Sequence, residues 1–422
     1  MKNYIAILFA LLLFGCFNSS KQTDRQTNLT LEEIIRGKNA LVDSVLNNKD
    51  KYELQIIYGK IDRNQNNFPI LKDYYFNVND NYFYPASVVK LIAAVLSLQK
   101  INELKAKGFH IDKNTTIIFE ESSVGHPSAY IDTTSENGKP SIAQYIKKIF
   151  LVSDNDAYNR LFEFCGAQYI NEELWKRGFI EARIAHRFFS SPNKTNSNLI
   201  TNPFKFIDNN GNILYEEPER IWDKDLSNNA PNNKKGKGYV KDNKLIEDRF
   251  DFSKLNYISL PSLYKILQIV IFPEIFEKEM RFNLSIDDYQ FLYKYMSMYP
   301  RESDYPKYEP YKKYFDGYCK FFMFGNTTDT IKESIRIFNK VGNAYGYTLD
   351  MAYIIDYEKK IEFFLAAVIH TNDNQVFNDD KYEYEEIAYP FMQEIGRIIY
   401  NYELRRERKY LPDLSKFNFW NK

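Results

Sequence analysis

Ser87 and Lys90 are the first residues in this chain whose types and spacing could support nucleophilic chemistry. They are the first and last residues of the segment S-V-V-K, which follows a turn containing Pro85. An apolar run begins within this segment and predicts a buried helix over residues 88–98. Positions i and i+3 share a helix face, so the lysine amine can reach the serine oxygen. Burial would lower the lysine pKa and supply a neutral base, and the helix N-terminus would favour a developing negative charge. The alternative interpretation is a serine N-cap followed by a lysine that snorkels to the surface.

Sequence context distinguishes this pair from others with the same spacing. The S-x-x-K pattern recurs at Ser97/Lys100, Ser191/Lys194 and Ser262/Lys265. Only the pair at residues 87–90 lies where a strand and a proline-containing turn lead into a strongly apolar helix. We therefore expect Ser87 Oγ to lie within hydrogen-bond reach of Lys90 Nζ, about 2.6–3.2 Å and looser without substrate. Ser97 should be buried and remote from the chemistry.

Two more motifs follow the serine–lysine pair along the chain. Residues 153–155 read S-D-N, a triplet that occurs once, between two short predicted helices. Residues 340–342 read K-V-G at the end of a predicted strand, and Asn343 follows. A K-x-G triplet alone is uninformative, because residues 176–178 and 234–236 share it. The ordered combination of the three motifs is more specific than any one of them.

This ordered set resembles the three motifs of class A β-lactamases and penicillin-binding proteins. The resemblance covers about residues 31–404, except for most of residues 190–253. It implies an α+β fold, with an antiparallel sheet flanked by helices, a mostly helical subdomain, and the active site between them. It also implies a serine hydrolase that acts on the amide bond of a β-lactam or of a related cyclic or peptide amide.

The resemblance implies catalytic roles for four side chains. Ser87 would attack the substrate carbonyl, and Lys90 would accept its proton. Ser153 would relay a proton to the leaving nitrogen. Lys340 would supply positive charge near Ser153 and near the substrate carboxylate.

It also implies substrate-binding roles for Asn155, Gly342 and Asn343. Asn155 would hold Lys90 and the amide side chain of the substrate. The backbone N–H groups of Ser87 and Asn343 would form the oxyanion hole, a device worth a few kcal/mol in the transition state.

One departure from the family pattern concerns release of the acyl-enzyme. Class A enzymes use a glutamate on a loop after S-D-N. In the aligned stretch here, Arg187 matches the arginine of that loop and the glutamate position falls on Phe189. Without that base, water attack should be slower by a factor on the order of 10²–10⁴. Glu216 or Glu217, at the end of a predicted hairpin, are candidate substitutes.

Two further departures concern the substrate carboxylate. Val341 replaces the usual hydroxyl residue, and no arginine occurs between Arg336 and Arg397 to serve as the auxiliary arginine of the family. Each lost partner is worth roughly 1.5–3 kcal/mol when charged. Two alternatives therefore stay open: a D-alanyl-D-alanine peptidase or esterase of the cell wall, and a low-turnover penicillin-binding-type protein of the envelope.

The first residues predict an export signal. Lys2 precedes an apolar run at residues 4–14, which is too short to span a bilayer and fits a signal peptide over residues 1–15. Gly15 and Cys16 then resemble a lipobox, which implies lipidation of Cys16, a tether at residues 16–29, and anchoring to a membrane of the bacterial cell envelope. The alternative is an ordinary signal peptide with a chance cysteine.

The remaining pattern predicts a sheet whose strands are split in the sequence. Strands are predicted at residues 53–61, 68–78, 334–341, 348–357 and 361–370. Helices are predicted at residues 31–46, 142–151, 156–164, 260–271, 286–296 and 385–404. An antiparallel sheet interrupted by a helical insertion explains this order, and a site is expected in the groove between the two parts.

These elements predict one serine hydrolase domain at residues 30–404, followed by a charged and aromatic tail at residues 405–422. The predicted subdivisions are a sheet subdomain of residues 30–86 and 334–404, a helical subdomain of residues 87–333, an insert at about residues 190–253, and a hairpin at residues 203–216.

Composition disfavours several other functions. Lys+Arg and Asp+Glu are 56 each, so no net charge attracts nucleic acid. The four histidines (His110, His126, His186 and His370) lack metal-ligand spacing and are interpreted as structural, so neither metal nor cofactor is expected. Cys165 and Cys319 could form a disulfide or remain as free buried thiols. The expected partners are an amide substrate and a lipid membrane.

Overall fold

The computed structural model describes residues 29–188, 197–309, 313–325 and 327–419. The predicted signal peptide, with Cys16, lies outside these residues, as does most of the predicted tether. Among the described helices, none is both long enough and apolar enough to cross a membrane.

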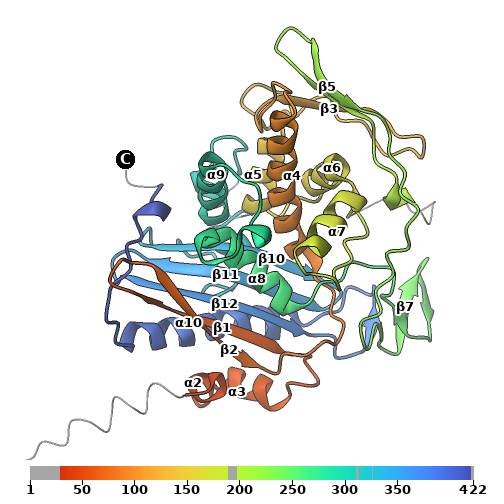
Figure 1. Ribbon diagram of the computed structural model, residues 1–422. Coiled ribbons are helices and arrows are strands. Elements are labelled where there is room, and N and C mark those ends of the chain that lie inside the picture. Colours follow the sequence, from red (N-terminus) through yellow and green to blue (C-terminus); the bar gives the residue numbers. More distant parts are fainter. Residues whose placement is uncertain (1–28, 189–196, 310–312, 326, 420–422) are drawn as a thin grey trace, which may run out of the picture.

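A five-stranded antiparallel sheet forms the centre of the fold (Figure 1). Its strands, in spatial order, are β10 (Ile335–Ala344), β11 (Tyr347–Asp356), β12 (Ile361–His370), β1 (Gln55–Arg63) and β2 (Pro69–Phe76). Strands β11 and β12 are buried at every position, which explains their nearly continuous apolar sequence. The predicted split sheet is therefore confirmed, with β1 pairing directly with β12.

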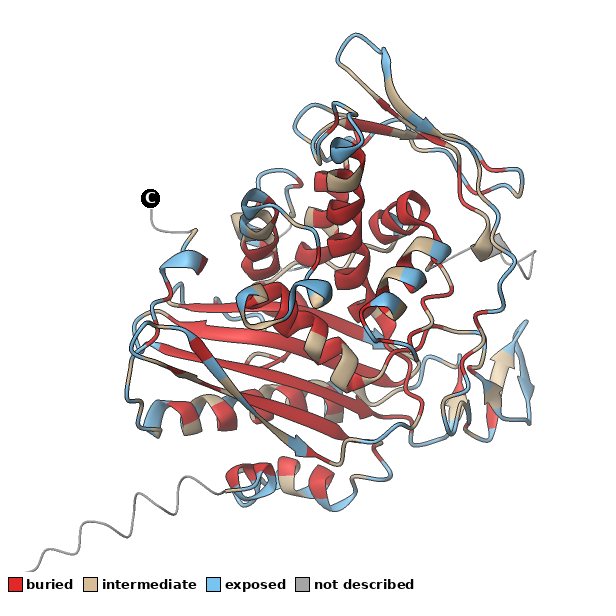
Figure 2. Ribbon diagram, viewed as in Figure 1, coloured by how far each residue is buried: buried red, intermediate tan, exposed pale blue. Residues whose placement is uncertain are grey.

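Helices cover both faces of this sheet (Figure 2). One face packs against α2 (Leu31–Ile35), α3 (Ala40–Asn47) and α10 (Tyr389–Arg405). The other packs against the helical subdomain through α8 (Leu260–Ile271) and α9 (Ile286–Ser297). The period-two alternation of β12 divides its side chains between two cores: Phe364 belongs to the core on the helical side, and Phe363 to the other.

Helix α4 (Val89–Ala106) is the axis of the helical subdomain. All its residues from Val89 to Ile101 are buried, because α5 (Ile142–Leu151), α6 (Asn155–Cys165), α7 (Ala167–Lys176) and the sheet surround it. The helix is therefore apolar around its whole circumference rather than along one stripe. This burial is what places a lysine in the interior at its first turn.

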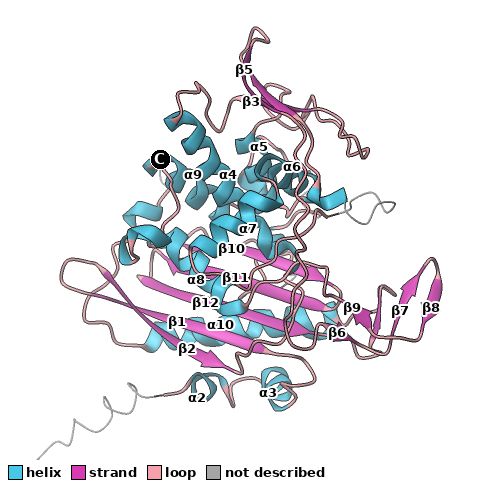
Figure 3. Ribbon diagram, turned by 45° about the vertical axis from the view of Figure 1, so that its right-hand side comes forward, coloured by secondary structure: helices cyan, strands magenta, loops and turns pink. Residues whose placement is uncertain are grey.

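Small sheets lie at the periphery of the molecule, one beyond the helices and the others beside one end of the central sheet (Figure 3). Strands β3 (Thr116–Phe119), β4 (Phe204–Ile207) and β5 (Ile213–Glu217) form one sheet, with β4 and β5 making the predicted hairpin. Strands β13 (Val376–Phe377), β7 (Gly238–Lys241) and β8 (Lys244–Ile246) form another, and β6 (Lys234–Lys235) pairs with β9 (Phe250–Asp251). Short 3₁₀ turns occur at Ala86–Val88, Ser197–Leu199, Pro273–Ile275, Lys278–Met280, Pro300–Glu302, Asp316–Cys319 and Ser415–Phe417.

The structure corrects several predicted elements. The helix expected over residues 31–46 is two helices, because Gly37 adopts φ 73° and Asn39 caps a new helix. Helix α7 was not expected. The C-terminal helix begins at Tyr389, after a π-helical turn at Tyr384–Ala388.

The C-terminal tail is also part of the core rather than a separate appendage. Leu414 and Phe417 are buried in the core on the helical side. Arg406 and Arg408 both bind Glu403, a buried carboxylate near the end of α10. The boundary predicted at residue 405 therefore marks no structural division among the described residues.

Candidate active site

The candidate nucleophile lies on a strained turn. Ser87 is half-buried in the 3₁₀ turn Ala86–Val88, which packs against β10. Ala86 adopts φ 46°, a conformation that costs a residue with a Cβ and often occurs at functional sites. Val88 caps α4 without a side-chain hydrogen bond, so the interpretation of Ser87 as an N-cap is wrong.

Lys90 is completely buried and donates to the S-D-N motif. Its Nζ lies 2.5 Å from the carbonyl oxygen of Ser153, 2.6 Å from Asn155 Oδ1 and 3.3 Å from Ser153 Oγ. Burial, aided by the charge of Lys340, holds the pKa of Lys90 well below its usual range. The two carbonyl-type acceptors satisfy both N–H groups of a neutral amine, which leaves its lone pair for a proton.

One expected contact is not formed among the described residues. Ser87 Oγ makes no hydrogen bond to Lys90 Nζ, because that nitrogen is directed towards Ser153 and Asn155 instead. Contacts between a catalytic base and its nucleophile are often loose before substrate binds. The burial of Lys90 and the remoteness of Ser97 are as expected: Ser97 is fully buried and contacts Cys165 Sγ at 3.3 Å.

Lys340 completes a chain of polar groups across the site. Its Nζ donates to Ser153 Oγ at 2.8 Å and to the carbonyl oxygen of Val341 at 2.9 Å. Burial lowers the pKa of Lys340 to about 8. Ser153 therefore lies between two lysines, and its φ of 57° shows that the loop is held in an unfavourable conformation to keep it there.

The end of β10 contributes the backbone that faces Ser87. A Cβ on Gly342 would lie 3.0 Å from Ser87 N and 2.9 Å from the carbonyl oxygen of Pro85, so this position has room only for glycine. Asn343 is fixed by its side chain, which donates to Tyr389 Oη at 2.8 Å and accepts from Thr348 Oγ1 at 3.0 Å. Strand β10 therefore places its backbone at Gly342 against the turn that carries Ser87.

Two cavities meet at Ser87. The first, of about 400 Å³, is lined by Ser87, Ser153, Asn155, Gly342 and Asn343 among others. The second, of about 940 Å³, shares Ser87, Asn155 and Asn343 and extends in another direction. The residues predicted as catalytic and substrate-binding thus lie in or directly beside one continuous cleft between the sheet and the helical subdomain.

An aromatic ring lies beside Lys90. The ring of Phe188 lies 5.1 Å from Lys90 Nζ, and Lys90 forms no ion pair among the described residues. Phe189, the aligned position of the family glutamate, lies outside those residues. The candidate substitutes Glu216 and Glu217 are wrong: both line a separate pocket beside β4, and Glu217 pairs with Lys100 at 2.8 Å.

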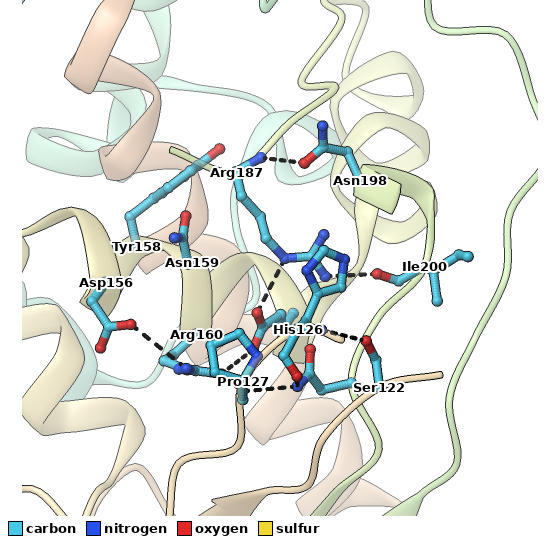
Figure 4. A network of polar contacts seen from close by, with 12 residues as sticks. Ser122, His126, Pro127, Asp156, Tyr158, Asn159, Arg160, Arg187, Asn198 and Ile200 are labelled. Atoms are coloured by element: carbon cyan, nitrogen blue, oxygen red, sulfur yellow. Dashed lines mark hydrogen bonds and ion pairs between the residues drawn. The ribbon is translucent and has the colours of Figure 1, made fainter. Parts of the chain in front are cut away.

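A buried ionic network fixes the segment that carries Phe188 (Figure 4). Arg187 Nε donates to Glu163 Oε1 at 3.1 Å, and Arg160 Nη1 donates to Glu163 Oε2 at 2.9 Å. Asn159 binds the backbone of Phe188 through both ends of its amide, at 2.6 and 2.8 Å. Helix α6 therefore positions Phe188 directly.

The wall of the first cavity lacks the hydroxyl side chain that the family pattern has at position 341. Val341 lines the first cavity, together with the aromatic side chains of Phe315, Tyr318, Phe321 and Tyr389. Sequence reasoning did not identify these aromatic residues, because they lie far from the motifs in the chain and a high aromatic content alone does not locate them. Cys319, which also lines the cavity, is a free buried thiol, as is Cys165.

Three of the four histidines lie away from the cleft, and the fourth lines it. His126 is buried, His110 lies near a surface pocket, and His370 stacks on Tyr347 with ring centroids 4.1 Å apart. His186 was interpreted as structural, yet it lines the second cavity and stacks on Tyr84. The described residues contain no cluster of metal-ligating side chains.

Comparison with known proteins gives one family match and several distant structural likenesses. The model of the beta-lactamase enzyme family matches residues 44–209, which contain Ser87, Lys90 and the S-D-N motif. No curated protein matches the chain. A β-lactamase from Francisella tularensis is 16% identical, with 86% of this chain and 98% of that chain covered and a TM-score of 0.43. A class A β-lactamase from Clostridium kluyveri is 14% identical, with 86% and 99% covered and a TM-score of 0.46.

The fold, the family match and the convergent motifs define a serine hydrolase that acts on amide bonds. Over the matched residues, the chain is similar to the beta-lactamase enzyme family.

Proposed function

We propose that Ser87 forms an acyl-enzyme with a β-lactam or with a related cyclic or peptide amide. The observation that carries this proposal is the position of Ser153, whose Oγ contacts Lys340 Nζ at 2.8 Å and Lys90 Nζ at 3.3 Å beside the same cavity that Ser87 lines. A nucleophile, a neutral amine and a proton relay are thereby assembled around one point.

Acylation follows from this arrangement. Ser87 Oγ adds to the substrate carbonyl carbon while Lys90 takes its proton, and the carbonyl electrons move to the oxygen. The N–H groups of Ser87 and Asn343 stabilise that oxyanion. When the carbonyl re-forms, the C–N bond breaks, the leaving nitrogen takes the proton of Ser153, and Lys90 returns a proton to Ser153. Lys340 holds the relay and attracts a substrate carboxylate.

Deacylation is expected to be slow. Water attack on the ester needs a base, and the described surroundings of Lys90 provide the ring of Phe188, 5.1 Å from Lys90 Nζ, but no carboxylate paired with that lysine. The loss of general-base help slows hydrolysis by a factor on the order of 10²–10⁴. This observation favours, as a second candidate, a low-turnover penicillin-binding-type protein or a cell-wall peptidase or esterase over a fast β-lactamase.

Intact-protein mass after incubation with a penicillin tests acylation directly, and stopped-flow hydrolysis of a chromogenic cephalosporin tests turnover. We expect a stable adduct and a burst close to one per site, followed by a slow steady rate. Ser87→Ala should abolish both, and Lys90→Ala should nearly do so. Ser97→Ala is the matched control, because it alters the other S-x-x-K serine of α4 and should retain the burst.

Two results would contradict the proposal. A steady kcat on the order of 10²–10³ s⁻¹ would show that an efficient deacylating base exists. Absence of any adduct with penicillins, cephalosporins and a D-alanyl-D-alanine depsipeptide would contradict acyl-enzyme formation itself. An adduct with the depsipeptide alone would favour the peptidase or esterase.

We also propose that the chain is exported and anchored in the bacterial envelope through acylated Cys16. The support is the sequence alone: an apolar run at residues 4–14 followed by Gly15 and Cys16. Detergent partitioning should place the wild-type protein in the detergent phase and Cys16→Ala in the aqueous phase. Equal partitioning of the two proteins would contradict the anchor.

A further inference from the structure

The larger of the two cavities is built from residues outside the three motifs. Tyr345 comes from the turn between β10 and β11, Tyr382 and Tyr384 come from the connection between β12 and α10, and Lys254 and Leu255 follow the insert. His186 and Phe188 complete its wall on the helical side. At about 940 Å³, this cavity is at the upper end of the size of small-molecule sites.

The position of the proton donor Ser153 indicates which half of a substrate each cavity would hold. Ser153, which would protonate the leaving nitrogen, lines only the smaller cavity, together with Val341. The leaving group therefore lies in the smaller cavity. The part of the substrate that stays attached to Ser87 after cleavage must lie on the other side of the serine, in the larger cavity.

Two tyrosines of the larger cavity accept backbone hydrogen bonds at their hydroxyl oxygens. The backbone N–H of Gly346 donates to Tyr384 Oη at 2.7 Å, and that of Asn378 donates to Tyr382 Oη at 2.9 Å. The two rings lie 5.4 Å apart, centroid to centroid. These hydrogen bonds fix both side chains to their loops, so the positions of the two rings beside the cavity are set before a ligand binds.

The insert holds this wall in place. Strand β13, directly before Asn378, pairs in parallel with β7 of the insert. Phe377 packs on Phe250 and Phe252, with ring centroids 5.6 and 5.1 Å away. Phe252 in turn contacts Tyr345 at 5.5 Å. The insert and the connection before α10 therefore form one packed unit beside the larger cavity.

We infer that this unit selects substrates whose acyl part ends in a planar aromatic ring, with Tyr345 and Tyr382 as the residues that determine specificity. The inference rests on the proposed acylation of Ser87, since that step defines the acyl side. The ring of the substrate stacks among the tyrosine rings, while its carbonyl reaches Ser87 and its amide reaches Asn155. The insert then has a function: it builds the acyl subsite.

Binding to the full chain carrying Ser87→Ala tests the subsite without relying on turnover. The probes are N-phenylacetylglycine and N-acetylglycine, which differ only in the ring, and calorimetry gives their affinities. We expect the aromatic probe to bind at least about tenfold more tightly. Adding Tyr345→Leu or Tyr382→Leu should reduce that ratio several-fold. Tyr75→Leu, on the exposed side of β2, is the control and should leave the ratio unchanged.

Equal affinities of the two probes, or a ratio that persists in both leucine variants, would overturn the inference. A parallel measurement separates this failure from failure of the proposed function. In the wild-type protein, acylation by benzylpenicillin should exceed acylation by 6-aminopenicillanic acid, which lacks the acyl ring, by a similar ratio. Equal acylation by both would overturn the inference and leave acyl-enzyme formation standing. Absence of both adducts, with tight binding of the aromatic probe, would instead reject the reaction and retain the subsite.

Discussion

At the scale of single residues, the proposed acylation depends on two buried lysines whose pKa values are both lowered by burial. Lys90 must be neutral to accept the serine proton, and burial lowers its pKa well below the usual range. Lys340 must be charged to attract a carboxylate, and its pKa is about 8. The hydroxyl of Ser153 lies between the two lysines and is in contact with both.

This difference predicts a bell-shaped pH dependence of acylation by carboxylate-bearing substrates. The rate rises as Lys90 loses its proton, and it falls as Lys340 loses its own near pH 8. Lys340→Arg should move the alkaline limb upward, because arginine stays charged. Stopped-flow acylation rates from pH 5 to about 10 measure both limbs. A methyl ester of the same substrate is the control, and an alkaline limb that is equally strong with the ester would refute the role of Lys340.

Gly342 gives a second prediction at this scale. In Gly342→Ala, the new Cβ would lie 3.0 Å from Ser87 N and 3.1 Å from Ala86 Cβ, so the strand must move away from the serine turn. Displacing an oxyanion donor should reduce the acylation rate by about 10²–10³. Thermal unfolding of the same variant shows whether the fold is kept. A folded variant with the wild-type rate would mean that these N–H groups do not form the oxyanion hole.

At the scale of elements, α6 connects the S-D-N loop to the segment that carries Phe188. Asn155 begins the helix and binds Lys90, Asn159 holds the Phe188 backbone, and Glu163 pairs with two arginines. The three residues are four apart, so they lie along one face of the helix. Helix α6 therefore positions both Lys90, through Asn155, and the ring of Phe188, through Asn159.

Glu163→Gln tests this coupling, because it leaves the buried charges of Arg160 and Arg187 without their shared carboxylate. We expect the free energy of unfolding to fall by about 3–5 kcal/mol. Glu32→Gln, which removes an ion pair with Arg36 in which both side chains are over a third exposed, should cost about 0–1 kcal/mol. Urea unfolding measures both. Equal losses in the two variants would contradict a structural role for the buried network.

At the scale of the whole molecule, the tail closes the core on the helical side. Phe417 is fully buried and lies 5.0 to 6.2 Å, centroid to centroid, from the rings of Tyr353, Tyr293, Phe338 and Phe272. Phe417→Ala should cost about 3–5 kcal/mol of unfolding free energy. Phe68→Ala, at a 43% exposed position, should change stability by less than about 0.5 kcal/mol. Equally small losses of unfolding free energy in the two variants would show that the tail packs only loosely.

The sequence predicted those parts of the fold that local pattern determines. Strands and helices with strong periodicity, such as β12 and α8, have the predicted bounds, and the apolar run after Ser87 correctly implied a buried Lys90. Contacts between distant segments were not predictable. Tyr345, Tyr382 and Phe188 line one cavity although they come from three distant parts of the chain, and no local pattern encodes contacts such as the pairing of β13 with the insert. Glu217 was misassigned for the same reason, since its partner Lys100 is on another element.

The pairing of β1 with β12 also limits when the protein can fold. Gln55 and Val368 are partners in the sheet, so the first strands have no neighbour on that side until almost the whole chain has been made. Strands β1 and β2 alone form an isolated hairpin, which is marginal in water. Such long-range pairing slows folding, because closing the long intervening loop costs conformational entropy before the contacts between the strands form. A chain that ends before residue 361 should therefore be cleaved by protease throughout β1, whereas β1 should be protected in the complete chain. Equal protection of β1 in both chains would show that the hairpin and the helical part fold without β12.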